Sequence, residues 1–301
     1  MVKTLDEIVS LVKSKPKMRL AVACGEDPHT IEAVARGVNE EMVNVTMVGN
    51  KAHINEVASK YSIDPSIFEI IDEPDKVKAT KKAVAMVRSG EADFLMKGLV
   101  DTAIYMKAIL DKEEGLLPEG RILSHITVLQ VPTYHKLLIG TDVAVIIAPT
   151  LEQKIAMINY ATEIAHLLGI DTPKVAILAA VEKVNPKMPV TLEAAVLSQM
   201  AKRGQIKGCI IDGPLAFDLA VSTESKKIKG VISEVAGDAD ILIFPDIEAG
   251  NIFYKTAVHL AKGEIAAIVA GALKPCVLTS RGDSEDSKFY SIALAALVAG
   301  K

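Results

Sequence analysis

Residues 19–48, RLAVACGEDPHTIEAVARGVNEEMVNVTMV, contain the pattern that decides the fold. The runs RLAVAC (19–24) and VNVTMV (43–48) are short and apolar, which is typical of buried strands. Between them, Asp27 and Pro28 have the form of an N-cap and a first-turn proline, and the apolar spacing over 29–40 predicts an amphipathic helix. The stretch therefore predicts a strand–helix–strand unit.

The same alternation continues along the whole chain. Near-continuous aliphatic strands that alternate with helices are typical of an α/β fold built from right-handed βαβ units. Predicted strands lie at 68–71, 93–96, 126–131, 143–148, 175–179, 208–211, 241–244 and 276–279. Predicted helices lie at 76–89 (closed by Gly90), 151–168, 191–203, 251–262 and 289–298.

The composition excludes several classes of protein. The 301 residues carry 34 Lys and Arg against 38 Asp and Glu, a net charge of −4 that suggests no binding to nucleic acid or to an anionic membrane. Aromatic residues make up 4% of the chain and Trp is absent, which argues against base-stacking surfaces. The length is a prior for two domains or one large α/β unit.

The cysteines and the N-terminal residues indicate a cytoplasmic location. Cys24, Cys209 and Cys276 are widely spaced and form no CxxC motif, so they fit buried thiols better than disulfides or a zinc site. Residues 1–15 predict an amphipathic helix and not a signal peptide, and no apolar run reaches the ~18 residues of a membrane span. We therefore expect a soluble, cytoplasmic protein.

The loop at 279–287, TSRGDSEDS, is the most unusual segment. It follows a predicted strand and precedes an apolar helix, which is where ligands bind in parallel α/β sheets. Arg281 has the chemistry to hold a phosphate, Ser280 to donate a hydrogen bond, and Asp286 or Asp283 to act as a base. Helix capping alone explains the Ser, Asp and Glu residues, but it does not explain Arg281 or the glycine after it.

Three further loops follow predicted strands. In MKGLVDT (96–102) and the helix after it, Lys97, Thr102 and Lys107 suit an anion, although lysines usually form a solvated helix face. In FPDIEAGNIFYK (244–255), Gly250 permits a tight turn and Asn251 suits a helix cap. DGP at 212–214 is by itself a turn signature. No metal site is expected, because the acidic pair at 246 and 248 is more simply explained as solvated. Loops of this composition predict a ligand-binding cleft.

Several strong catalytic signatures are missing from the sequence. It has no GxxxxGK[ST] phosphate loop, no GxGxxG after the first strand, no HExxH and no GxSxG. ATP hydrolysis through a phosphate loop, Rossmann-type hydride transfer and zinc proteolysis therefore have no direct support.

The segments FPDIEAGNIFYK, IIDGPLAFDLA and LKPCVLTSRGDSEDS resemble the phosphate acetyltransferase/phosphate butyryltransferase family. MKGLVDTAIYMKAIL and RILSHITVLQVP favour the butyryl branch. The resemblance implies two α/β domains with an interdomain cleft and an isocitrate/isopropylmalate dehydrogenase-like fold. Residues 1–135 with 275–301 would form the first domain and 136–274 the second, inserted one. It also implies a homodimer or a higher homo-oligomer.

The same resemblance implies the reaction and the site. The family transfers an acyl group between coenzyme A and inorganic phosphate, with acyl-CoA as a substrate and no bound cofactor. The implied catalytic residues are Ser280, Arg281 and Asp286. The implied phosphate- or CoA-binding residues are Lys97, Gly98, Thr102, Lys107, Asp283, Gly250 and Asn251. Lys97, Lys107 and Leu278 replace a serine, an arginine and an aspartate of the acetyl branch, which also favours butyryl-CoA over acetyl-CoA.

Other functions remain open on the sequence. The alternatives are a phosphate acetyltransferase, a metal- and NAD-dependent 2-hydroxyacid dehydrogenase relative, and a non-catalytic acyl-CoA-binding regulatory protein. The dehydrogenase would need a carboxylate metal cluster and a nicotinamide site. The SRG segment and the free-standing length count against the regulatory protein.

Overall fold

The computed structural model describes residues 1–279 and 282–301, and the chain within it divides into two compact units. The terminal unit comprises Leu5–Leu123 and Ile265–Lys301. The central unit comprises Ser124–Glu264 together with Met1–Thr4. Each unit has its own helices and its own part of a β-sheet, so the predicted α/β class is confirmed. The division into domains 1–135 with 275–301 and 136–274 stays a prediction.

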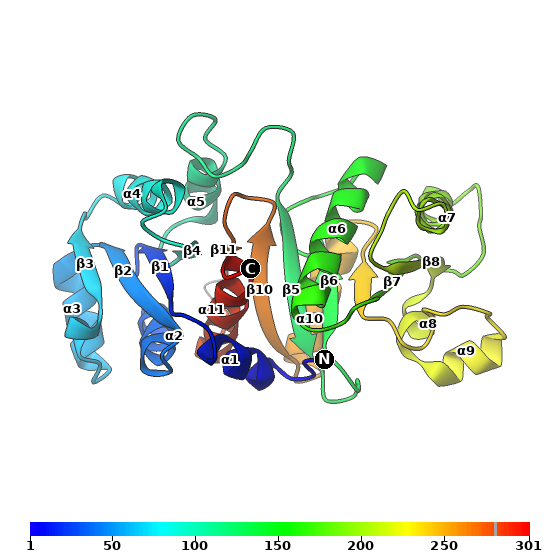
Figure 1. Ribbon diagram of the computed structural model, residues 1–301, viewed down its shortest axis with the longest axis horizontal. Coiled ribbons are helices and arrows are strands. Elements are labelled where there is room, and N and C mark those ends of the chain that lie inside the picture. Colours follow the sequence, from blue (N-terminus) through cyan, green and yellow to red (C-terminus); the bar gives the residue numbers. More distant parts are fainter. Residues whose placement is uncertain (280–281) are drawn as a thin grey trace. The chain divides into compact units, whose positions relative to one another are not determined.

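The terminal unit contains six strands in the order β3-β2-β1-β4-β11-β10. The first five are parallel to their neighbours, and β10 is antiparallel to β11. Figure 1 shows how strands from the start and the end of the chain (blue and orange) join in this unit. The strands are β1 (Met18–Ala23), β2 (Val43–Gly49), β3 (Glu69–Asp72), β4 (Phe94–Lys97), β10 (Glu264–Ala270) and β11 (Cys276–Val277).

Caps predicted from the sequence begin and end the helices of this unit. The Asp27 carboxylate accepts a hydrogen bond from the amide of Thr30 at 3.0 Å, so α2 begins as predicted, with Pro28 in its first turn. Gly90, at φ 81°, ends α4. The helices are α1 (Leu5–Lys13), α2 (Pro28–Asn39), α3 (Lys51–Lys60), α4 (Lys76–Ser89), α5 (Thr102–Ile109) and α11 (Glu285–Ala299), with a 3₁₀ turn η1 (Pro65–Ile67).

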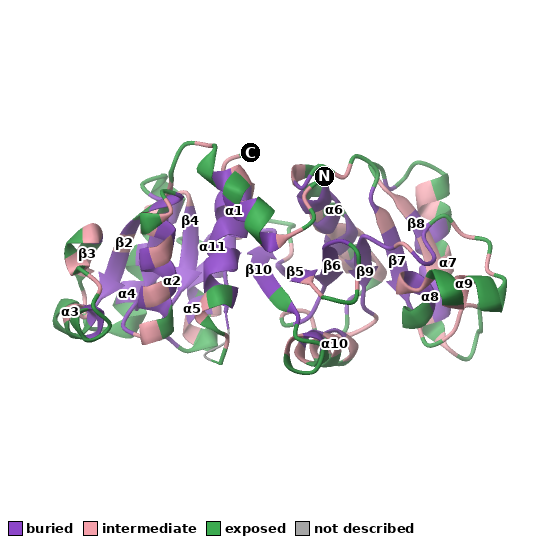
Figure 2. Cartoon of the chain, turned by 90° about the horizontal axis from the view of Figure 1, so that it is seen from below, coloured by how far each residue is buried: buried purple, intermediate pink, exposed green. Residues whose placement is uncertain are grey.

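Helix α11 forms the centre of the terminal unit. It packs against α1, α2, β4 and β11. Its side chains are buried without interruption from Ser287 to Leu297, and Figure 2 shows α11 coloured as buried along most of its length. A helix that is apolar all round is usually buried in the interior of a domain. The long apolar run after the 279–287 loop, which the sequence predicts as a helix, is buried in this way.

The central unit has the strand order β5-β6-β9-β7-β8. β5 and β6 are antiparallel, and the remaining pairs are parallel. Its strands are β5 (Ser124–Gln130), β6 (Leu138–Thr141), β7 (Lys174–Leu178), β8 (Ile210–Leu215) and β9 (Ile241–Ile243). Its helices are α6 (Leu151–Leu167), α7 (Pro189–Lys202), α8 (Phe217–Val221), α9 (Thr223–Lys229) and α10 (Ile247–His259).

The predicted strand at 143–148 is wrong. The strand is β6, which ends at Thr141, and the apolar residues after it form irregular turns. The Asp142 carboxylate accepts hydrogen bonds from the amides of Ala144 and Val145, at 2.8 and 2.7 Å, and these bonds curl the chain out of the sheet. Strand β10 was missed, although its apolar run follows the turn at Lys262 and Gly263 that separates it from α10.

Among the described residues, no helix has both the length and the apolar character that a bilayer crossing requires.

Truncating α11 in the core should destabilise the terminal unit. Leu294 is 0% exposed, so we expect Leu294→Ala to cost about 3 kcal/mol through lost apolar contacts and a residual cavity. Leu192→Ala, at a position that is 41% exposed on α7, is the control and should change stability by less than about 0.5 kcal/mol. Urea unfolding followed by circular dichroism measures both, and equal losses would contradict the central place of α11.

Candidate active site

The carboxyl ends of β1, β4 and β11 meet at one edge of the terminal unit, because these strands are parallel neighbours. The turn after β4 lies directly against the end of β1. The amide of Gly98 donates to the carbonyl of Ala23 at 2.8 Å, and the amide of Leu99 donates to the carbonyl of Cys24 at 2.5 Å. A Cβ on Gly98 would lie 2.1 Å from the Cys24 carbonyl oxygen, so only glycine fits there. The predicted residue Gly98 therefore shapes this edge.

Lys97, the last residue of β4, is a buried lysine. Its side chain is bent back over the turn, and its ammonium group donates hydrogen bonds to the carbonyl oxygens of Gly98 (3.2 Å) and Val100 (3.1 Å). The residue is only 3% exposed. Since lysine is almost never fully buried unless it is paired, Lys97 is not the solvated surface lysine that the sequence left open.

The loop after β11 carries the predicted catalytic residues. Thr279 is buried at its start, whereas Ser280 and Arg281 lie outside the described residues. After them, Gly282 is exposed and Asp283 is half-buried. Ser284 then caps α11, since its hydroxyl accepts a hydrogen bond from the amide of Ser287 at 3.2 Å.

Lys288 is a residue that sequence reasoning missed. It lies in the first turns of α11 and is only 3% exposed, and its ammonium group donates to the Thr279 hydroxyl at 3.4 Å. The available signal was a lysine directly before the long apolar run FYSIALAALV. The predicted helix at 289–298 begins one residue after Lys288 and therefore leaves this lysine outside it.

Lys97 and Lys288 line the same small cavity of about 170 Å³. The remaining wall comes from the start of α2, from the end of α3 and from the turn after β4; the residues are Asp27, Pro28, His29, Tyr61, Gly98 and Leu99. All of these residues belong to the terminal unit. The structure therefore brings the predicted residues Lys97 and Gly98 together with an unpredicted second lysine.

Asp286 lies on the flank of α11 that faces α2. Its carboxylate accepts a hydrogen bond from the Arg36 guanidinium at 2.7 Å, and Glu285 accepts another from the same group at 3.3 Å. Arg36 also lies over the ring of Phe289, 3.7 Å from its centroid. The Asp286 side chain is 56% exposed, and the residue is not among those that line the 170 Å³ cavity.

The other predicted binding residues lie elsewhere. Thr102 and Lys107 are exposed on α5 and do not line this cavity. Gly250 and Asn251 belong to α10 of the central unit. A Cβ on Gly250 would lie 2.1 Å from the Asp142 carbonyl oxygen, and the Asn251 amide donates to the Val143 carbonyl at 3.0 Å. These two residues pack α10 against the turns that follow β6.

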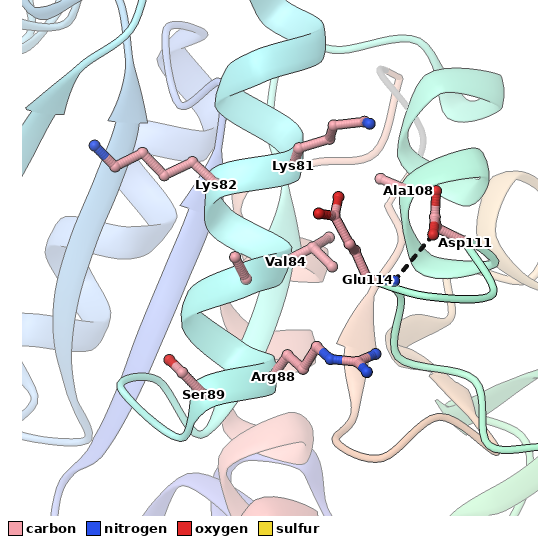
Figure 3. Close-up of a pocket in the computed structure, with 9 residues that line it drawn as sticks. Lys81, Lys82, Val84, Arg88, Ser89, Ala108, Asp111 and Glu114 are labelled. Carbon is pink, nitrogen blue, oxygen red and sulfur yellow. Dashed lines mark hydrogen bonds between the residues drawn. The ribbon is translucent and has the colours of Figure 1, made fainter.

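Two larger cavities contain none of the predicted residues. One of about 530 Å³ lies between α4 and α5, and Figure 3 shows Glu114 between Lys81 and Arg88 in it. The other, of about 570 Å³, lies in the central unit beside Phe217 and Phe253. The first is lined by charges of both signs, and the wall of the second mixes apolar side chains with hydroxyl groups and Glu224.

The buried thiol at the same edge is not prepared for nucleophilic attack. Burial raises the pKa of Cys24 to about 11, and the nearby charge of Glu26 adds to this effect. Burial alone raises the pKa of Cys276 to about 12. Because the thiolate is the reactive form, these shifts work against a covalent enzyme intermediate on either cysteine.

Several known proteins of similar sequence or structure are named as phosphate acyltransferases or phosphotransacylases. Residues 3–82 and 74–296 match the family described as phosphate acetyl/butaryl transferase. A phosphate butyryltransferase of Clostridium acetobutylicum is 47% identical over 100% of this chain and 99% of that protein. A phosphate acetyltransferase of Thermotoga maritima is 47% identical over 98% of this chain and 99% of that protein. A branched-chain phosphotransacylase structure from Enterococcus faecalis matches with a TM-score of 0.83 and 30% identity, covering 94% of this chain and 99% of that chain.

The raised pKa values predict unequal thiol reactivity. At about pH 8, a thiol with a pKa near 11 is on the order of 0.1% thiolate, so Cys24 and Cys276 should resist a disulfide reagent in the folded protein. Burial also raises the pKa of Cys209, but this thiol is only half-buried, so it should react faster than the other two. Counting thiols before and after denaturation measures this, with Cys209→Ser as the control. Rapid labelling of Cys24 in the folded protein would contradict the expected burial.

Proposed function

Because the chain belongs to the phosphate acetyl/butyryl transferase family, we propose that it reversibly transfers a short acyl group between coenzyme A and inorganic phosphate. The observation that carries this proposal is the 47% identity to a phosphate butyryltransferase over the full length of both chains. Butyryl-CoA is the proposed acyl donor, and acetyl-CoA is the alternative, because an acetyltransferase is equally similar. Coenzyme A enters as a substrate, and no bound cofactor is proposed.

The finer structural expectations belong to the same proposal. They are an isocitrate/isopropylmalate dehydrogenase-like fold, domains 1–135 with 275–301 and 136–274 around a cleft, a homo-oligomer, and a cytoplasmic location. The family resemblance supports each of them. The dehydrogenase relative and the regulatory protein, which the sequence left open, have no comparable support from relatives of similar length.

The proposed chemistry is a direct transfer without a covalent enzyme intermediate. In the direction from acyl phosphate, a carboxylate takes the proton of the CoA thiol, whose ordinary pKa is about 8.5. The thiolate attacks the acyl carbonyl, a C–S bond forms, and the C–O bond to phosphate breaks with its electron pair on the phosphate oxygen. The proton passes to the departing phosphate, so the products are acyl-CoA and inorganic phosphate. Holding both substrates in place supplies much of the rate.

Each proposed catalytic residue has one role in this scheme. Arg281 stabilises the phosphate and the developing oxyanion, and Ser280 positions the phosphate or the thiol. Asp286 is the proposed base, with Asp283 as the alternative. The contact of Asp286 with Arg36 offers a competing, purely structural role, so the two aspartates need separate tests.

The proposed binding residues differ in their support. Lys97 and Gly98 are supported by burial and by their shared cavity. Thr102, Lys107, Asp283, Gly250 and Asn251 are supported by the resemblance alone.

The activity itself is the first prediction. We expect thiol release from butyryl-CoA to require inorganic phosphate, and kcat/KM to be about tenfold higher for butyryl-CoA than for acetyl-CoA, because added methylenes bind an apolar pocket. A series of acetyl-, propionyl-, butyryl- and isobutyryl-CoA, with and without phosphate, measures this. Thiol release at the same rate with and without phosphate would exclude the transferase. Reduction of NAD(P) by hydroxy acids with a metal ion would favour the dehydrogenase.

Variants at Asp286 and Arg36 separate a base from a structural ion pair. If Asp286 is the base, Asp286→Asn should lower kcat by about 100-fold or more, whereas Arg36→Gln should leave kcat within about twofold. Both variants lose the ion pair between Arg36 and Asp286. Arg36→Gln also loses the contacts with Glu285 and Phe289, so thermal unfolding should report the larger loss of stability for Arg36→Gln. If both variants keep wild-type turnover and Asp283→Asn does not, the base is Asp283. Wild-type turnover in all three would remove both aspartates from catalysis.

A further inference from the structure

Two buried lysines from distant parts of the sequence line one cavity. Lys97 ends strand β4, and Lys288 extends from helix α11, which lies nearly two hundred positions later in the chain. Each residue is 3% exposed, and both line the cavity of about 170 Å³. Lysine side chains are usually exposed, so the burial of two in one place is a specific feature of this fold.

The hydrogen bonds described for the two ammonium groups orient them. Lys97 donates to the carbonyl oxygens of Gly98 and Val100, and Lys288 donates to the hydroxyl of Thr279. Each of these bonds fixes the direction of one ammonium group. The cavity wall also includes Asp27, whose carboxylate caps α2 through the Thr30 amide.

Two like charges on one small cavity favour an anion inside it. An anion bound in the cavity offsets the cost of burying positive charge along its wall. Hydrogen bonds between an ammonium group and a phosphate are charge-assisted and therefore strong. At about 170 Å³ the cavity is smaller than the roughly 300–1,000 Å³ of sites for drug-sized ligands, so it suits one phosphate-sized group.

The cavity also has a suitable place in the fold. Thr279, which Lys288 contacts, lies two residues after the end of β11 and begins the 279–287 loop that carries the proposed catalytic residues. Lys97 precedes the turn at the carboxyl end of the neighbouring strand β4. The charge, the volume and the position of the cavity therefore all suit a phosphate group.

We propose that Lys288 and Lys97 together form the subsite that binds a phosphate group of a substrate. The group belongs either to inorganic phosphate and acyl phosphate or to coenzyme A. This inference rests on the proposed function for its place in the reaction, but binding of phosphate to the two lysines can be measured without turnover. The competing explanation is that Lys288 only holds the loop through Thr279.

The test uses Lys288→Met, which keeps the apolar stem and removes the charge, and Lys288→Arg, which keeps the charge. Lys97→Met is a second variant, in case Lys288→Met fails to fold. Lys60→Gln is the matched control, because Lys60 is exposed and directly precedes the cavity residue Tyr61. The kinetic measurements are the KM values for phosphate, for butyryl-CoA and for the butyryl thioester of dephospho-CoA. The binding measurement is the rise in thermal unfolding temperature with added inorganic phosphate.

We expect the KM for phosphate to rise about 10- to 100-fold in Lys288→Met and Lys97→Met, with partial recovery in Lys288→Arg. The stabilisation by phosphate should disappear in both methionine variants and remain in Lys60→Gln. The unfolding temperature without phosphate should stay the same or rise, because replacing a buried charge with an apolar group is often neutral or stabilising. A rise in the KM for butyryl-CoA alone would assign the subsite to a phosphate of coenzyme A.

Other outcomes separate this inference from the proposed function. If all KM values and the phosphate stabilisation match those of Lys60→Gln, the subsite is wrong and Lys288 only holds the loop. If the wild-type protein lacks phosphate-dependent turnover but is stabilised by phosphate, and Lys288→Met is not, the subsite stands and the proposed reaction falls. If phosphate binds only as an adventitious ion at the surface, Lys60→Gln and Lys288→Met should lose the stabilisation by phosphate to the same extent. That result would also overturn the inference.

Discussion

The close approach of Gly98 to the carbonyl oxygen of Cys24 is the constraint on which this edge of the terminal unit depends. No side chain fits between the two backbones, so the turn after β4 lies directly against the end of β1. The hydrogen bonds from Gly98 and Leu99 to that strand end hold the turn in place. The Lys97 side chain is therefore confined to the buried edge, where the neighbouring strand β11 ends at Val277, two residues before Thr279. The position of one charge thus follows from a backbone contact.

Local chemistry made much of the fold predictable from the sequence. The cap at Asp27, the proline after it and the apolar runs on both sides specify one strand–helix–strand unit, and each signal agrees with the others. The misassigned strand at 143–148 shows where such signals fail. Its aliphatic composition favours a strand, but the buried carboxylate of Asp142 offers the next amides an alternative set of hydrogen bonds. A short apolar run cannot reveal that competition.

The candidate site was predictable only where it depends on residues that are close together in the sequence. Lys97 and Gly98 occupy a strand end, a position that the strand pattern alone identifies. Lys288 required knowledge of what α11 packs against, because an isolated lysine at the start of an apolar helix normally extends to water. The partner of Asp286 is Arg36, 250 positions earlier in the chain, and only the packing of α11 on α2 brings them together.

The order of strands in the terminal unit has a consequence for biosynthesis. Strand β11 is the parallel neighbour of β4, yet it and α11 belong to the segment Ile265–Lys301, made after the entire central unit. A nascent chain up to Glu264 contains every strand of the central unit, so that unit is able to fold first. The terminal unit has to wait with an open edge at β4 until β11 and α11 emerge from the ribosome. For that interval an exposed, aliphatic strand edge is a candidate for chaperone recognition.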